Sequence, residues 1–385
     1  MNPQPLYDFS PVLHIMLMGM VVALGPLAWM WLRNPRAVPA RRLRALTLVV
    51  LFLTFDLVLF GAFTRLTDSG LGCPDWPGCY GNASPTGAHA QIEQAQAAMP
   101  SGPVTHGKAW VEMIHRYLAT GVGVLILTLA AGTWVLRRRG AAVSPWWPTV
   151  TLAWVCLQGA FGAWTVTMKL FPAMVSMHLL AGIALLALLC RQAVTYAQAQ
   201  QGGVPTGLAP AERGWLIAAF VLVWVQIALG GWVSTNYAVL ACTDFPTCHG
   251  TWWPAMDFRQ GFELWRELGK TGTGDHIGFE ALTAIHYLHR LMAYLVFVVL
   301  GLAAFRLQRA GALRRQAAWI AGLALWQLAS GISNVVLGWP LAVAVAHTGG
   351  AAALVVVLTW ALGERRRAMP AAADAVRATP RGRAA

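Results

Sequence analysis

The segment Glu112-Met-Ile-His115-Arg116 lies at the start of a long apolar run that extends over about 109–136. An acid, a histidine and an arginine cost free energy inside a membrane, and such groups persist where they face a bundle interior and have a function. Glu112 and His115 are three residues apart, so they share one helix face. We therefore expect this helix to line the interior of a membrane bundle.

The composition is that of a polytopic membrane protein. Of the 385 residues, 57% are apolar and 11% are charged, which excludes a soluble globule. Nine apolar runs are each long enough to span the roughly 30 Å apolar core of a bilayer. Backbone groups in lipid must be paired within their own segment, so we predict nine helices and an all-α integral membrane protein. The runs are about 12–32, 45–63, 109–136, 146–167, 172–196, 214–233, 280–305, 317–336 and 341–362.

The positions of lysine and arginine predict the topology. Twenty of the 28 basic residues fall in connecting segments that alternate with segments poor in lysine and arginine. By the positive-inside rule we place the basic segments in the cytoplasm. This placement accounts for the net charge of +13, so we expect no nucleic-acid partner. No basic residue precedes Arg33, so we expect the N-terminus outside, the C-terminus inside and no cleaved signal peptide. A removable targeting segment is the minor alternative.

Two predicted outer loops share the pattern Cys-x-Asp-aromatic-Pro-x-Cys-x-Gly at an offset of 169 residues. The first loop holds Cys73 and Cys79, and the second holds Cys242 and Cys248. An oxidising outer compartment favours a disulfide in each loop, and a turn with proline can bring its ends together. For the first pair, a structural staple and a redox role during turnover both stay open.

Four histidines lie inside predicted helices at repeat-related positions. His178 and His347 have the same offset of 169, and His115 and His289 are 174 apart. At 1.5 Å per residue, all four lie about 9–14 Å below the outer surface. Imidazole is a standard ligand of haem iron, so we predict a bis-histidine haem site in each half. Hydrogen-bonded core histidines and a metal-ion site are the alternatives.

The repeat implies two four-helix halves related by a pseudo-twofold axis along the membrane normal. The first helix has no counterpart and is extra to this arrangement. The predicted segments are an N-terminal helix with a basic cytoplasmic loop (1–44), the first half (45–196), a cytoplasmic linker (197–212), the second half (213–363) and a basic cytoplasmic tail (364–385).

These motifs resemble those of heme A synthase. The resemblance covers about 45–363 and is highly specific in the first half. It rests on Gly61-Ala-Phe-Thr-Arg65-Leu-Thr-Asp-Ser-Gly-Leu-Gly-Cys73-Pro-Asp-Trp-Pro77, Glu112-x-x-His115-Arg116, Gln158-Gly-Ala-Phe-Gly162, His178-Leu-Leu-Ala and His347. It implies an eight-helix, pseudo-symmetric bundle that converts haem O to haem A for haem-copper terminal oxidases. The reaction implied is oxidation of the haem C8 methyl to a formyl group by successive hydroxylations and loss of water.

The resemblance also implies ligands and partners. His289 and His347 would hold the iron of a resident haem b, and His115 and His178 that of the substrate haem O. The partners implied are haem O and haem A, membrane lipid, the haem O synthase (protohaem farnesyltransferase) and oxidase assembly factors. The location implied is the bacterial inner membrane, with the haem sites near its outer face. A homo-oligomer stays open.

The charge that looks catalytic is confined to the site in the first half. The second half has His286 at the position of Glu112, and Ser234 at that of Arg65. We therefore predict Glu112 and Arg65 as catalytic residues, with Glu112 acting as a base or stabilising positive charge near the methyl group. A salt bridge from Glu112 to Arg116 or Arg65 is the alternative.

Three arginines lie near the outer boundary and could pair with haem propionates. They are Arg65, Arg116 and Arg290. Snorkelling to the interface is the alternative role.

Two other functions fit a membrane protein with two haem sites. One is a di-haem b electron-transfer subunit that oxidises quinol, with Glu112 as a proton relay. The other is a haem transporter or chaperone. Formation of haem A from haem O would exclude both as the main function.

Overall fold

The computed structural model describes residues 10–34, 38–201, 203–205, 208–311 and 313–367. Within these ranges, nine helices are long and apolar enough to cross a membrane, which confirms the prediction of an all-α membrane protein. They are α1 (Ser10–Arg33), α2 (Pro39–Leu66), α4 (His106–Arg138), α5 (Trp146–Thr167), α6 (Pro172–Gln201), α7 (Pro210–Thr235), α9 (Phe279–Arg309), α10 (Arg314–Val336) and α11 (Leu341–Gly363). Arg36 and the tail arginines Arg377, Arg381 and Arg383, which entered the topology prediction, lie outside the described residues.

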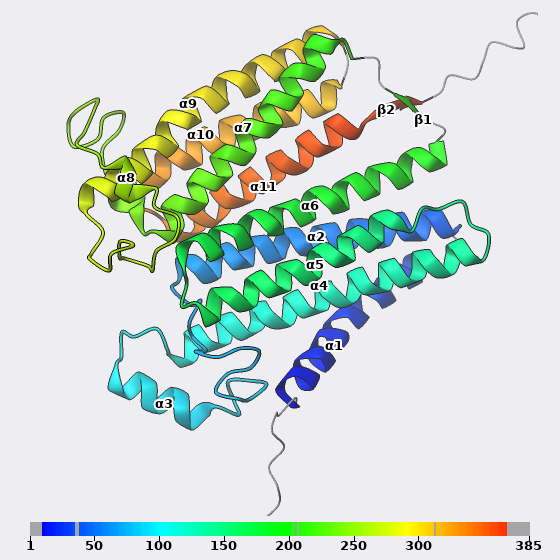
Figure 1. Ribbon diagram of the computed structural model, residues 1–385. Coiled ribbons are helices and arrows are strands. Elements are labelled where there is room, and N and C mark those ends of the chain that lie inside the picture. Colours follow the sequence, from blue (N-terminus) through cyan, green and yellow to red (C-terminus); the bar gives the residue numbers. More distant parts are fainter. Residues whose placement is uncertain (1–9, 35–37, 202, 206–207, 312, 368–385) are drawn as a thin grey trace, which may run out of the picture.

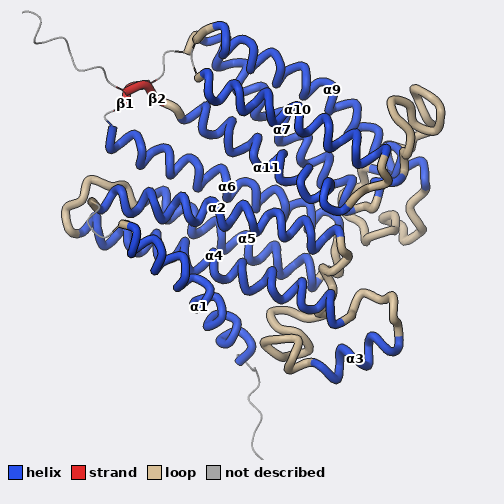
Figure 2. The backbone as a smooth tube through the Cα atoms, turned by 180° about the vertical axis from the view of Figure 1, so that it is seen from behind, coloured by secondary structure: helices blue, strands red, loops and turns tan. Residues whose placement is uncertain are grey.

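The helices pack in two groups of four. In the first group each of α2, α4, α5 and α6 contacts the next, and α6 closes the ring against α2. Helices α7, α9, α10 and α11 form a second ring in the same way. Helices α2 and α6 of the first group meet α11, and α6 also meets α7, so the two rings lie side by side (Figures 1 and 2). This arrangement fits the two halves that the repeat predicts.

Helix α1 packs along the outside of α4. Small residues make this contact close: a Cβ added at Gly19 would lie 2.5 Å from Thr120 Cγ2, and one at Gly121 would lie 2.8 Å from Val22 Cγ1. Close backbone approach at small residues is a common way for helices to associate in lipid. The extra helix is thus attached to the first half.

The two ends of the bundle differ. The loops with the cysteine pattern lie at one end, together with α3 (His89–Ala98) and α8 (Phe258–Gly261) (Figure 1). The short helix η1 (Ala238–Leu240) follows α7 and contacts α7 and α9. These three short helices were not predicted, because none carries a membrane-length apolar run. At the other end, β1 (Gly203–Pro205) pairs antiparallel with β2 (Arg365–Arg367) and joins the linker to the segment after α11. The linker is shorter than predicted, since α6 extends to Gln201 and α7 begins at Pro210.

Candidate functional site

One cavity of about 910 Å³ reaches into both halves of the bundle. Its walls are mainly apolar, and it lies among α2, α4, α5 and α6 on one side and α7, α9, α10 and α11 on the other. The polar residues predicted for the site converge on it, although they come from helices far apart in the sequence. They are Arg65, Glu112, His115, Arg116, His178, His289, Arg290 and His347.

Each of the four histidine rings packs against a glycine of a neighbouring helix. A Cβ added at these glycines would lie between 2.9 and 3.4 Å from the ring, which is tighter than ordinary contact at three of them and at the limit of ordinary contact at Gly331. The glycines repeat at the offset of 169 residues, as do the α6 and α11 histidines. The pairs are Gly61 with His115, Gly162 with His178, Gly230 with His289, and Gly331 with His347. The glycines therefore let each ring lie against its neighbouring helix and leave the cavity open.

The first-half histidines have few polar partners. The ring of His115 stacks on Phe60 of α2, with 6.2 Å between centroids and 10° between planes. His178 Nδ1 is buried and has no hydrogen-bond partner. Gln158 Nε2 donates to the His178 backbone carbonyl at 2.9 Å, which leaves the ring itself unbound. His178 therefore stands beside the cavity with no fixed polar partner on Nδ1.

The second-half histidines are held by polar side chains. Gln226 Nε2 lies 3.1 Å from His289 Nδ1 and 3.1 Å from the carbonyl oxygen of the same residue. Ser330 Oγ lies 2.8 Å from His347 Nδ1. Our sequence reasoning missed both partners, although the repeat contained a signal. The matching first-half residues are apolar: Leu57 for Gln226 and Phe161 for Ser330.

Glu112 is buried, with 4% of its surface exposed. Its Oε2 accepts from the backbone N–H of Cys73 at 2.8 Å, and its Oε1 accepts from Arg116 Nη2. The salt bridge to Arg116 left open by the sequence is thus present, one turn along α4. Glu112 ties the helix that carries His115 to the first disulfide loop.

Arg116 holds the first loop in place. Its Nη1 donates to the carbonyls of Asp75, Pro77 and Gly78, at 3.0, 3.0 and 2.5 Å. A guanidinium offers five donors in a planar fork, so it can bind Glu112 and the loop at once. This loop-holding role adds to the two roles that the sequence suggested.

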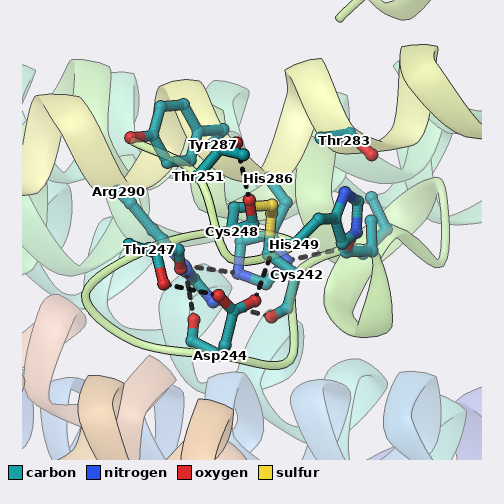
Figure 3. Close-up of a disulfide and its surroundings, with 12 residues drawn as sticks. Cys242, Asp244, Thr247, Cys248, His249, Thr251, Thr283, His286, Tyr287 and Arg290 are labelled. Carbon is teal, nitrogen blue, oxygen red and sulfur yellow. Dashed lines mark hydrogen bonds between the residues drawn. A yellow bond between two sulfur atoms is a disulfide. The ribbon is translucent and has the colours of Figure 1, made fainter. Parts of the chain in front are cut away.

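Arg290 does the same in the second half (Figure 3). Its Nη1 donates to the carbonyls of Asp244 and Thr247, at 2.8 and 3.1 Å, and its Nη2 donates to that of Cys242 at 2.6 Å. Its Nε donates to His286 Nε2 at 3.2 Å. Two of the acceptor positions, Asp244 and Thr247, are the repeat counterparts of Asp75 and Gly78.

His286 takes the place of Glu112 in the second half. Its Nδ1 lies 3.0 Å from the Ala238 carbonyl, which can only accept, so Nδ1 carries the proton. Its Nε2 is then free to accept from Arg290. A neutral imidazole thus bridges arginine and loop where the first half uses a carboxylate, and the acidic group lies in one half only.

The predicted disulfides are confirmed. Cys73–Cys79 and Cys242–Cys248 have S–S distances of 2.05 and 1.98 Å, and all four cysteines are buried. None of these four cysteines lines the cavity.

An aspartate organises each disulfide loop. Asp75 accepts from the backbone N–H groups of Tyr80 and Gly81, at 2.6 and 2.7 Å. Asp244 accepts in the same way from His249 and Gly250, at 2.8 and 3.0 Å (Figure 3).

Asp244 has an additional donor. The Thr247 hydroxyl donates to it at 2.6 Å. Together with the backbone N–H groups, this hydrogen bond holds the pKa of the Asp244 carboxyl well below its usual range.

Arg65 lies where the two halves meet. Its Nη2 donates to the Ser234 carbonyl at 2.5 Å, and its guanidinium stands 3.9 Å from the centre of the Tyr237 ring. Asp68 accepts from Arg65 Nη1 at 3.3 Å and from the Tyr237 hydroxyl at 2.6 Å. Ser234 and Tyr237 are the repeat counterparts of Arg65 and Asp68. A residue that contacts its own counterpart must lie near the pseudo-twofold axis, so Arg65 stands between the two histidine pairs.

The chemistry of these donors fits a haem better than a bare ion. Among the described residues, no group of three or more His, Cys, Asp or Glu side chains could hold a metal ion. Pairs of histidines in an apolar cavity, with arginines nearby, suit an iron porphyrin with carboxylate side chains.

Comparison with known proteins agrees with this chemistry. A family model described as cytochrome oxidase assembly protein matches residues 44–359. The heme A synthase of Shewanella oneidensis is 39% identical over 319 residues, which cover 80% of this chain and 92% of that protein. Heme A synthases of Caulobacter sp. and Halalkalibacterium halodurans are 32% and 25% identical, over 81% and 74% of this chain and 92% and 85% of their own. Helix α1 lies outside the family match.

Proposed function

The chain belongs to the cytochrome oxidase assembly protein family, together with the heme A synthases, and we propose that its two halves divide one haem oxidation between them. It is a membrane-bound oxidoreductase that converts haem O to haem A. The first half binds haem O through His115 and His178, and the second half holds a resident haem b through His289 and His347. When bound, haem b supplies one-electron exchange.

The observation that carries this division is Glu112, the single buried carboxylate among the residues that the structure describes. Glu112 lies in the cavity wall one turn from His115, and its counterpart His286 is a neutral imidazole that holds a loop. Oxidation of a methyl group releases protons, and a carboxylate is the group that can accept them. Each Glu112 oxygen accepts one hydrogen bond and keeps a further acceptor position. We assign proton acceptance at the C8 methyl to these oxygens.

The three arginines differ in what they have left to offer a ligand. Arg116 uses Nη1 on loop carbonyls and Nη2 on Glu112. Arg290 donates from Nη1 and Nη2 to loop carbonyls and from Nε to His286, so the contact of either arginine with a propionate would be secondary. Arg65 uses one donor on Ser234 and one on Asp68, and it lies between the two sites. A guanidinium is well suited to bind a carboxylate. Arg65 is therefore our first choice to bind propionates, from where it stabilises negative charge beside the reacting haem.

The disulfide loops and the basic segments support a position of this chemistry near the outer face. The disulfide loops lie at the end of the bundle opposite β1 and β2 (Figure 1). Arg116 and Arg290 donate to carbonyls of these loops, and Arg65 lies in the last turn of α2, next to the first loop. Disulfides persist in oxidising compartments, and the basic segments belong on the cytoplasmic side. The N-terminus is then outside and the C-terminus inside. Haem O arrives from a protohaem farnesyltransferase, and haem A leaves toward oxidase assembly factors.

Haem composition tests the division. The full chain is expressed in a host that supplies haem O, and its haems are extracted and separated by mass. We expect haem A or its alcohol intermediate, together with haem b, in the wild type. His289→Ala and His347→Ala should lose haem b, whereas His115→Ala and His178→Ala should keep haem b and make no haem A. Two equivalents of haem b, with no modified haem despite available haem O, would contradict the synthase proposal and favour the electron-transfer alternative.

A further inference from the structure

The two halves differ in the hydrogen-bond partner of Nδ1 of the second histidine of each pair, His178 in the first half and His347 in the second. We propose that Ser330 is a positioning residue that fixes His347 as a permanent iron ligand. The inference rests on the proposed resident haem b in the second half. It adds a residue outside the cavity lining whose effect on haem retention can be measured separately from turnover.

The hydrogen bonds around Ser330 determine which nitrogen of His347 carries a proton. Ser330 is 3% exposed on α10, and its hydroxyl faces the Trp326 carbonyl at 2.7 Å and the His347 Nδ1 atom at 2.8 Å. A carbonyl can only accept, so the single hydroxyl proton goes to Trp326. Ser330 Oγ must then accept from Nδ1–H. Nε2 of His347 keeps its lone pair, and this tautomer is the one that binds iron through Nε2.

The first half lacks this device at the matching position. Phe161 occupies the place of Ser330, and His178 Nδ1 is buried with no partner. The following residue is a glycine packed against the histidine ring in both halves, Gly162 and Gly331. The backbone setting is therefore alike, and the difference lies in one side chain.

This difference suits the two tasks. A ligand whose Nδ1–H is bound by a fixed acceptor is held in one orientation and is a stronger base, and loss of such a partner typically weakens metal binding about 10–100-fold. The second half must keep its haem through many turnovers. The first half must take in haem O and release haem A, and a ring without a fixed partner favours exchange.

The test uses the full-length protein from a host that makes haem b but no haem O. Transfer of haem b to an excess of apomyoglobin measures retention, and a redox titration measures the midpoint potential. We expect Ser330→Ala to lose haem b about 10–100-fold faster than the wild type. Its midpoint potential should rise, since a weaker base stabilises ferric iron less. Ser330→Thr keeps the hydroxyl and should restore both values. Phe161→Ala is the matched control and should change neither.

The outcomes separate this inference from the proposed function. Wild-type retention and potential in Ser330→Ala would overturn the role of Ser330 while leaving the division of the halves intact. A haem b signal that persists in His347→Ala would overturn the division itself, and the Ser330 assignment with it. Ser330→Cys keeps the size of the side chain but is a weak acceptor, so it should shift both values in the same direction if the alanine variant does not accumulate.

Discussion

Glu112 is bound by donors from two different elements, the Cys73 backbone of the disulfide loop and the Arg116 guanidinium of its own helix. The sequence was sufficient to single out Glu112, because an acid at the start of an apolar run needs a reason to be there. It was also sufficient to suggest the Arg116 partner, which lies one turn away. The hydrogen bond from Cys73 to Glu112 could not be predicted from the sequence, because the two residues are 39 apart and the loop between them has no periodic pattern.

Replacing Arg116 tests how much this cluster of Glu112, Arg116 and the first loop contributes to stability. Arg116→Met removes the partner of a buried carboxylate and leaves three loop carbonyls without their donor. Breaking a buried pair by removing one partner costs about 3–5 kcal/mol. We expect a clear fall in the thermal unfolding midpoint of the purified protein. Arg259→Met, at an exposed arginine of the short helix α8, is the control and should unfold like the wild type.

The glycines beside the histidines make a second residue-scale prediction. A Cβ at Gly230 would lie 2.9 Å from His289 Cε1, so Gly230→Ala must push the ring out of place. We expect a lower haem b content per protein, measured by the pyridine haemochrome spectrum. Gly301→Ala on α9 is the matched control, because a Cβ there meets nothing within 4 Å. Equal haem b content in the two variants would show that the ring tolerates the added methyl group.

At the scale of elements, the predicted and observed structures agree best where the chain is most apolar. Hydropathy predicts all nine membrane helices, since length and composition decide whether a segment can span a bilayer. It missed α3 and α8, which lie in polar loops. It also missed Gln226 and Ser330, because polar residues on a membrane helix do not reveal their partners until packing is known. The repeat predicted the disulfides, and the loops around them are built on Asp75 and Asp244 alike.

The second disulfide loop should respond to acid through Asp244. Hydrogen bonds hold the pKa of this carboxyl below its ordinary value of about 3.9. The stability that it contributes is therefore present above the unfolded pKa and is lost as the pH falls through the lower folded pKa. We expect Asp244→Asn to melt below the wild type at pH 7 and the difference to shrink below about pH 4. If the difference in melting temperature stays constant with pH, it would come from the changed fit of the side chain and not from its charge.

At the scale of the whole molecule, two similar halves surround one cavity, and the contact between Arg65 and its own counterpart marks their axis. The repeat, with an offset of 169 residues for His178 and His347 and of 174 for His115 and His289, predicted the two histidine pairs from the sequence alone. It did not predict that all four rings line a single cavity, because an offset relates equivalent residues without stating how far apart the copies stand. Helix α1, outside the family match, is attached to the first half through Gly19 and Gly121.

The proposed orientation of the whole molecule can be measured directly. In a Cys156→Ser background, Thr273→Cys lies in the loop between α7 and α9, and Ala310→Cys lies between α9 and α10. We expect a membrane-impermeant maleimide to label Thr273→Cys in intact spheroplasts and Ala310→Cys only after lysis. The reverse pattern would invert the topology and place the haem sites near the cytoplasm.

The measurement that tests the central claim most directly is the haem composition of Glu112→Gln in a host that supplies haem O. Glutamine keeps the shape of the side chain and an acceptor for the Cys73 N–H, but it cannot take up a proton at neutral pH. We predict that Glu112→Gln retains haem b and bound haem O but forms neither haem A nor its alcohol intermediate. The control Glu280→Gln, at an exposed acid in the first turn of α9, should form haem A like the wild type. Haem A at the wild-type level in Glu112→Gln would contradict the account, because the oxidation would then not depend on the buried carboxylate that distinguishes the first half.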